Sequence, residues 1–326
     1  MDITAPPWTW IITLAAMLFA LVSGTNDGAT LLALGVRASR MPLLWATFIL
    51  TSTVVAAPLF LGTRVAATFI DRLVRFDDQL AVSMLIAVIG ALATVAFLGW
   101  RGLPTSLTVA TLGALVGAGA GRGLEVHWGT VALVVLVALV TPVIGFVIAF
   151  LISRLAMQID LRGQVSGLLE KLHIGAFAIQ CLAYGSNDGQ KMVAVFFVTG
   201  GVSTTSEIMV RPTDMVVIAI FFALGTLLGL RRYARTVVLD VFPIRPASAV
   251  AAEMAAAASV LGTGLLGSPV STTQTVVTSV IGSGSHEGFR RIRWQSVVRI
   301  GTAWLYTFPL TFLLGMALSW LSRGIL

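Results

Sequence analysis

Two short polar stretches in this chain, each an asparagine followed by an aspartate, lie inside long apolar runs. The first, Asn26-Asp27, contains the one charged residue between positions 8 and 36. The second, Asn187-Asp188, is followed three residues later by Lys191. A carboxylate at membrane depth is costly unless a partner compensates it. These residues are therefore the first candidates for a functional site.

A second pair of motifs combines a proline with hydroxyl side chains. Pro104 is followed by Thr105 and Ser106, and the stretch Pro269–Thr273 reads Pro-Val-Ser-Thr-Thr. Proline near the first helical position and hydroxyl residues in the first turn are typical of a helix N-terminus. If such a helix begins inside the membrane, its unpaired N–H groups and partial positive charge point into the protein. The motifs therefore predict an anion site.

The composition defines the class of protein that must position these motifs. Of 326 residues, 57% are hydrophobic and 11% charged, and mean hydropathy is +0.96. Soluble domains carry about 25% charged residues. The apolar runs show no alternation of period two, which argues against a β-barrel. The net charge of +7 lies in short loops and so reports topology, not nucleic-acid binding. We predict an all-α polytopic protein of the lipid bilayer.

The apolar runs predict the membrane segments. At about 20 residues per crossing, they lie near 8–36, 43–63, 79–99, 103–121, 129–152, 173–200, 213–230, 248–266, 269–284 and 295–322. The first run is too long for one straight crossing, so we expect a helix broken near the Asn26-Asp27 pair. The run 269–284 is too short to span the hydrocarbon core, which favours a re-entrant hairpin arm. The three histidines fall in or near loops.

The motifs also recur at nearly constant spacing. The two Asn-Asp pairs are 161 residues apart, and the two proline-hydroxyl motifs are 165 apart. We predict two repeats, at 1–155 and 173–326, joined by a cytoplasmic linker at 156–172. Each repeat would hold a broken helix, a plain helix, a helical hairpin and a final helix. Because this gives an odd number of crossings, the second repeat is inverted. Twelve Lys and Arg residues on one face against six on the other place the N-terminus outside the cell membrane.

The candidate residues suit an anion that enters together with a cation. Secondary transporters bind their substrates at the interface between inverted repeats. The Asn26 and Asn187 amides, the tip hydroxyls and Lys191 are donors for a small oxyanion. Each aspartate would repel that anion by about 3 kcal/mol at about 5 Å and an effective dielectric near 20. Either Na⁺ at Asp27 and Asp188 or a proton on one of them must compensate. We expect no other cofactor.

One further acidic residue, Glu253, lies in an alanine-rich apolar run before the second hairpin tip. It has no counterpart in the first repeat. Two interpretations stay open for it: a buried hydrogen bond that packs two helices, and a part in binding the coupling ion.

At these residues the sequence resembles the inorganic phosphate transporter (PiT) family. That family carries Gly-Ala-Asn-Asp-Val in each inverted repeat and Gly-Leu-Pro-Val-Ser-Thr-Thr-His at each hairpin tip. Here the first motif reads Gly-Thr-Asn-Asp-Gly at 24–28 and Gly-Ser-Asn-Asp-Gly at 185–189. The tip motif is nearly intact at 269–273 and weaker at 103–108. The resemblance implies that broken helices and hairpin tips enclose phosphate, with Na⁺ or H⁺ sharing the Asn and Asp residues.

The donor chemistry and the resemblance together assign residues to roles. The expected substrate-binding residues are Asn26, Asp27, Thr105, Ser106, Asn187, Asp188, Lys191, Ser271 and Thr272. The expected coupling-ion residues are Asn26, Asp27, Thr108, Asn187, Asp188, Glu253 and Thr273. The chain departs from the family pattern at four positions: Thr30 in place of Asn, Leu107 in place of a hydroxyl residue, and Val109 and Gln274 in place of His.

The sequence therefore predicts a secondary active transporter, not an enzyme, that couples phosphate to Na⁺ or H⁺ by alternating access. A sulfate or other oxyanion permease of the same fold stays open, because the family includes sulfate permeases. An anion channel and an intramembrane aspartate-dependent enzyme are more remote alternatives. The sequence leaves the oligomeric state open, a homo-oligomer included.

Overall fold

The computed structural model describes residues 7–38, 41–101, 105–156, 158, 165–200, 208, 210–233, 246–285, 288 and 292–323. Over these ranges the chain is almost entirely helical and forms no strand. Seven of the helical spans there are long and apolar enough to cross a membrane: Trp10–Val36, Leu43–Leu61, Leu80–Trp100, Trp128–Ala156, Pro212–Leu230, Pro246–Leu265 and Trp294–Ser322. The predicted all-α polytopic class is confirmed.

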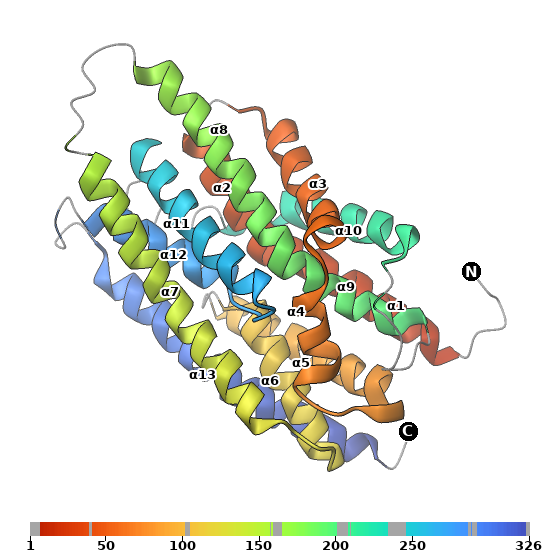
Figure 1. The fold of residues 1–326 in the computed structure, drawn as a ribbon. Coiled ribbons are helices and arrows are strands. Elements are labelled where there is room, and N and C mark those ends of the chain that lie inside the picture. The colour runs from red at the N-terminus through yellow and green to blue at the C-terminus, as the bar shows by residue number, and fades with distance from the viewer. Residues whose placement is uncertain are drawn as a thin grey trace.

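The first half of the bundle contains seven α-helices and the second half six in the described part of the chain (Figure 1). The first set is α1 Pro7–Ser23, α2 Ala29–Ala38, α3 Leu43–Leu61, α4 Arg64–Ala67, α5 Leu80–Trp100, α6 Leu107–Arg122 and α7 Trp128–Ala156. The second set is α8 Val165–Tyr184, α9 Gln190–Phe197, α10 Pro212–Tyr233, α11 Pro246–Leu265, α12 Thr272–Ser285 and α13 Trp294–Ser322.

The two Asn-Asp motifs form π-helical turns, η1 at Gly24–Gly28 and η4 at Gly185–Gly189. The expected interruption of each helix therefore takes the form of a wider turn, without a break in the chain's helical path. Ser23 before η1 and Ala29 after it both keep right-handed helical dihedral angles. A π turn carries one extra residue, which displaces side chains from the regular helical register, and such turns are frequent at functional sites.

The glycines of these turns allow close contact with a helix from the other half. A Cβ on Gly24 would overlap the Phe222 carbonyl oxygen of α10. A Cβ on Gly189 would lie 2.6 Å from the Val54 carbonyl oxygen of α3. Small residues bring helix backbones together in this way within membrane proteins. Thus α10 covers the first π turn and α3 covers the second, and the halves are interlocked.

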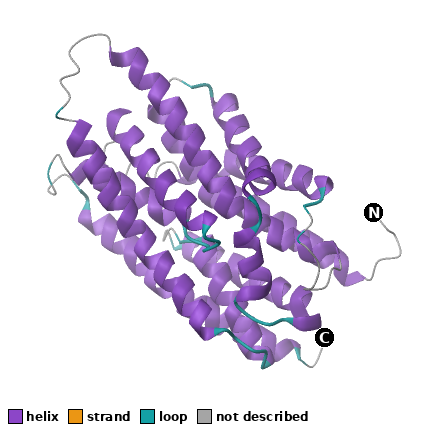
Figure 2. Cartoon of the chain, viewed as in Figure 1, coloured by secondary structure: helices purple, strands orange, loops and turns teal. Residues whose placement is uncertain are grey.

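Two helices begin inside the bundle. The loop between α11 and α12 lies in the middle of the molecule and not at one of its ends (Figure 2). The following helix α12 has 14 residues, and α6 has 16. At 1.5 Å per residue both are shorter than the roughly 30 Å core of a bilayer. Residues of α6 and α12 are buried over nearly their whole length, as inner elements must be. Pro104, before α6, lies outside the described residues.

Part of the stretch predicted as a linker is helical. The first helix of the second half, α8, begins at Val165, so residues 165–172 belong to it. Glu170 and Lys171 suggested a loop, but they lie on the exposed surface of this helix. The position of His173 is a second correction: it lies within α8 and is fully buried, not in a loop.

Candidate functional site

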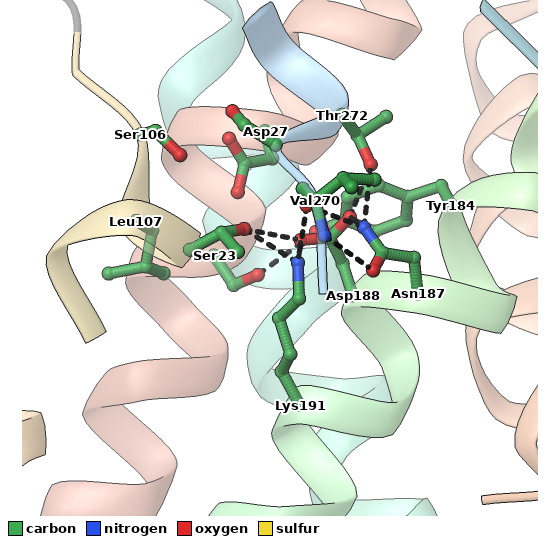
Figure 3. Close-up of polar contacts among 12 residues, drawn as sticks. Ser23, Asp27, Ser106, Leu107, Tyr184, Asn187, Asp188, Lys191, Val270 and Thr272 are labelled. Atoms are coloured by element: carbon green, nitrogen blue, oxygen red, sulfur yellow. Dashed lines mark hydrogen bonds and ion pairs between the residues drawn. The ribbon is translucent and has the colours of Figure 1, made fainter. Parts of the chain in front are cut away.

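The predicted substrate residues meet in one buried polar group. They come from η1, from η4 with α9, and from the starts of α6 and α12, where hydroxyl and amide side chains from separate parts of the sequence face one another. Each has at most 4% of its surface exposed: Asn26, Asp27, Thr105, Ser106, Thr108, Asn187, Asp188, Lys191, Ser271, Thr272 and Thr273. Figure 3 shows how closely the labelled members of this group lie.

Each asparagine ties its π turn to a helix start. Asn26 Nδ2 donates to the Thr105 carbonyl at 3.1 Å, just before α6. Asn187 Nδ2 donates to the Val270 carbonyl at 2.7 Å, just before α12, and its Oδ1 accepts from Val270 N–H at 3.2 Å. The amides are thus the structural link between the turns and the helix starts that they face.

Two serines cap these helices in the same way. Ser106 Oγ accepts from Val109 N–H at 3.2 Å, and Ser271 Oγ accepts from Gln274 N–H at 3.3 Å. This is the side-chain cap expected of a hydroxyl residue at a helix start. Among the described residues neither hydroxyl donates to a protein acceptor. Each serine therefore has a proton left to donate to a ligand.

Four donors surround the carboxylate of Asp188. Its Oδ1 accepts from Lys191 Nζ at 2.8 Å and from Thr108 Oγ1 at 3.3 Å. Its Oδ2 accepts from Asn187 Nδ2 at 3.2 Å and from the Thr272 hydroxyl. An ammonium and three neutral donors compensate the buried charge, as a buried carboxylate requires.

The carboxylate of Asp27 has fewer partners. Its Oδ1 accepts from Asn26 Nδ2 at 2.8 Å and from the Thr273 hydroxyl. In the part of the chain that the structure describes, no protein donor reaches Asp27 Oδ2. No basic side chain in these ranges pairs with Asp27, although it is 3% exposed. When it is ionised, the carboxylate of this half therefore has no cationic partner among the described residues.

The side chain of Lys191 extends from α9 into the group of oxygens around Asp188 (Figure 3). Its Nζ donates to Thr108 Oγ1 at 2.6 Å, to Asp188 Oδ1 at 2.8 Å and to the Val270 carbonyl at 2.8 Å. Together with Asp188, it links the second π turn and α9 to both helix starts, α6 and α12.

Two residues of this region escaped the sequence analysis. Ser23 Oγ and Tyr184 Oη form a buried hydrogen bond of 2.9 Å between the helices that precede the two π turns. They are 161 residues apart, the same spacing as the Asn-Asp pairs. That shared register is the signal that would have found them. The carbonyls of Thr105 and Val270 also contribute, but a backbone group leaves no mark in the sequence.

Glu253 lies in a separate buried contact. Its Oε1 is 3.2 Å from His173 Nε2, and both side chains are fully buried between α11 and α8. Gln180 also lies on the buried side of α8. Neither atom of its side-chain amide has a hydrogen-bond partner among the described residues. No described hydrogen bond joins Glu253 to the group around Asp27 and Asp188.

Comparison with known proteins gives a consistent result. The model of the phosphate transporter family matches residues 23–315. A probable low-affinity inorganic phosphate transporter of Mycobacterium leprae is 31% identical over 95% of this chain and 77% of its own length. One of Bacillus subtilis is 26% identical over 94% of this chain and 95% of its own. A solved structure described as the sodium-dependent phosphate transporter has a TM-score of 0.81 at 20% identity, covering 98% of this chain and 99% of that one.

Proposed function

Because this chain belongs to the phosphate transporter family, we propose that it carries inorganic phosphate across the cell membrane together with a cation, Na⁺ or H⁺, by alternating access. The observation that carries this proposal is the pairing, in one buried group, of unused hydroxyl donors with an uncompensated carboxylate. The donors suit an oxyanion and the carboxylate suits a cation, so the two ligands would neutralise each other.

The anion half of the proposed site is built on the two helix starts. Ser106 and Ser271 would donate their free hydroxyl protons to phosphate oxygens. The first N–H groups of α6 and α12, next to Thr105 and Thr272, would add the partial positive charge of helix N-termini. Asn26 and Asn187 would hold these starts in place, and each amide would contact phosphate by exchanging its present N–H bond to Asp27 or Asp188.

The cation half is built on the carboxylates. A phosphate about 5 Å from Asp27 would be repelled by about 3 kcal/mol at an effective dielectric near 20. A cation on the free Oδ2 of Asp27 would remove that repulsion, with the Thr273 hydroxyl beside it. Thr108 would have the equivalent place beside Asp188, where Lys191 already supplies a positive charge. We also propose that Glu253, which is paired with His173, takes part in binding the coupling ion at a place outside the substrate group.

The interlocked halves support alternating access between two inverted repeats. The π turn of each half is covered by a helix of the other, and equivalent hydrogen bonds join each turn to a helix start. Two pseudo-equivalent sets of contacts around one substrate give two arrangements of similar energy, one open to each side. We propose that the N-terminus lies outside, as the distribution of basic residues predicts.

The test is phosphate uptake by the purified protein in liposomes, under a Na⁺ gradient and a pH gradient applied separately. We expect labelled phosphate to accumulate under one of them, and excess sulfate to leave the rate unchanged. The protein with Ser106 and Ser271 both replaced by Ala serves as the matched control, since it keeps the carboxylates. Equilibration of phosphate without dependence on either gradient would contradict the coupled mechanism.

A further inference from the structure

We propose that the Lys191 ammonium is a built-in cation, which occupies at Asp188 the place that a mobile coupling cation occupies at Asp27. This inference rests on the proposed function and specifies its ion stoichiometry. Lys191 follows Asp188 at the distance at which Thr30 follows Asp27. The two residues thus hold equivalent positions in the two halves, and one of them carries a positive charge.

The atoms around the Lys191 ammonium are those that a metal cation would select. They are a carboxylate oxygen, a threonine hydroxyl and a backbone carbonyl, at 2.8, 2.6 and 2.8 Å from Nζ. Coupling cations in transporters are held by such carbonyls and side-chain oxygens near non-regular helical turns. The side chain is 3% exposed, so protein atoms enclose the charge.

The same contacts leave Lys191 without a donor for phosphate. A lysine ammonium has three N–H groups and no acceptor. Asp188, Thr108 and Val270 take all three. The sequence analysis predicts Lys191 as a substrate ligand because of its charge, whereas the contacts direct that charge to the second carboxylate.

Among the described residues, no fixed positive charge occupies the equivalent place beside Asp27. The Thr30 hydroxyl donates to the Asn26 carbonyl at 2.8 Å. Leu107 stands where the second half has Thr272, the donor to Asp188 Oδ2. These two differences leave Asp27 Oδ2 without a donor among the described residues. Asp27 is thus open to a mobile cation and Asp188 is closed to one.

Electrostatic repulsion then limits the number of mobile cations that the polar group can bind. With both carboxylates ionised, the two carboxylates and one ammonium give the group a net charge of −1. A second cation about 4 Å from the ammonium would be repelled by about 4 kcal/mol at an effective dielectric near 20. The protein should therefore move one cation fewer per phosphate than it would with both carboxylates free.

The deciding experiment measures the charge moved per phosphate in liposomes, from the membrane potential that stops net phosphate flux at fixed gradients. This potential depends on the total charge moved per phosphate, whether Na⁺ or H⁺ carries it. We expect Lys191→Thr to raise the charge per phosphate by about one elementary charge. Lys171→Thr, which removes an exposed lysine of α8, should leave the ratio at the wild-type value. An unchanged ratio in Lys191→Thr, or a change confined to the KM for phosphate, overturns the inference.

A binding measurement covers the case in which the variant inserts but does not transport. In detergent at constant ionic strength, the Tm of Lys191→Thr should rise with added Na⁺ or ammonium more steeply than that of the wild type. N-methylglucamine, a bulky organic cation, is the balancing ion. Equal slopes would overturn the inference. Gradient-independent uptake by the wild type would instead refute the proposed function, and this Tm comparison would still test Lys191.

Discussion

Asp27 and Asp188 occupy equivalent positions in two π turns, yet in the described part of the chain two donors contact the first and four contact the second. The same difference extends to their neighbours, since Thr30 and Leu107 in one half correspond to Lys191 and Thr272 in the other. In the described structure one half thus surrounds its carboxylate with protein donors, and the other half leaves one carboxylate oxygen without a donor. Predictions that treat the halves differently test this division.

Asp27→Asn should have the largest effect on transport. Removing the free carboxylate removes the proposed cation partner, and an ion pair at about 4 Å and a dielectric near 20 is worth about 4 kcal/mol. Coupled phosphate uptake should fall by roughly a thousandfold, while Tm in detergent changes little, because Asp27 has no charged partner to strand. Asp78→Asn, at an exposed position, is the control. Uptake at the wild-type rate in Asp27→Asn would contradict the role given to this half.

Asp188→Asn should instead act on stability. It leaves the Lys191 ammonium buried without its carboxylate, and breaking a buried pair in this way costs about 3–5 kcal/mol. The double variant Asp188→Asn with Lys191→Met should recover much of that loss, because no charge remains unpaired. Denaturant unfolding of the detergent-purified variants measures both. If the single and double variants were equally unstable, the ion pair would not hold this half together.

The glycines of both turns should be sensitive to a single added methyl group. Gly24→Ala and Gly185→Ala would overlap the carbonyl oxygens of Phe222 and Thr53. Overpacking of this kind costs about 1–3 kcal/mol. Gly175→Ala within α8 meets no atom within 4 Å and is the matched control, which should be neutral or slightly stabilising. Thermal unfolding in detergent would show whether the two turns are equally tightly packed; a tolerant turn would mark the half that moves.

The smallest effect is expected at the serine caps of α6 and α12, which are alike in the two halves. Ser271→Ala removes one neutral donor, worth about 0.5–1.5 kcal/mol. The KM for phosphate should rise several-fold with maximal rate nearly unchanged, and Ser106→Ala should match it. Ser259→Ala in α11, whose hydroxyl bonds its own helix, is the control. A KM that responds to one serine only would show that phosphate is held by one helix start and not by both.

The class of fold and the membership of the polar group could be predicted from sequence for one physical reason. A polar residue inside an apolar run must find a partner, so Asp27, Asp188 and the hydroxyl stretches can be recognised from the local sequence alone. Their spacing then adds the information that they come in pairs. The residues at 24–28 form a π turn where we expected a break, because glycine at both ends and the lack of proline let the helix continue through them.

The sequence could not predict which partner each charge finds. Lys191 is three residues from Asp188, which suggests an ion pair, but its contacts with Thr108 and Val270 join segments about 80 residues away. His173 follows a charged stretch that looks like a loop, and only the packing of α8 on α11 brings it to Glu253. Contacts of this range depend on how helices are arranged in three dimensions, which local pattern does not encode.

The cover that α10 gives to the first π turn has a consequence for biosynthesis. As the chain is made from its N-terminus, Asp27 enters the membrane well before residues 212–233 of α10 have been synthesised. Throughout that interval the buried carboxylate lacks the helix that will enclose it, and Thr273, its hydroxyl donor, is later still. The first half must therefore wait as an incomplete intermediate at the insertion machinery or in contact with lipid. Final closure of the site can follow only when nearly the whole chain has been translated.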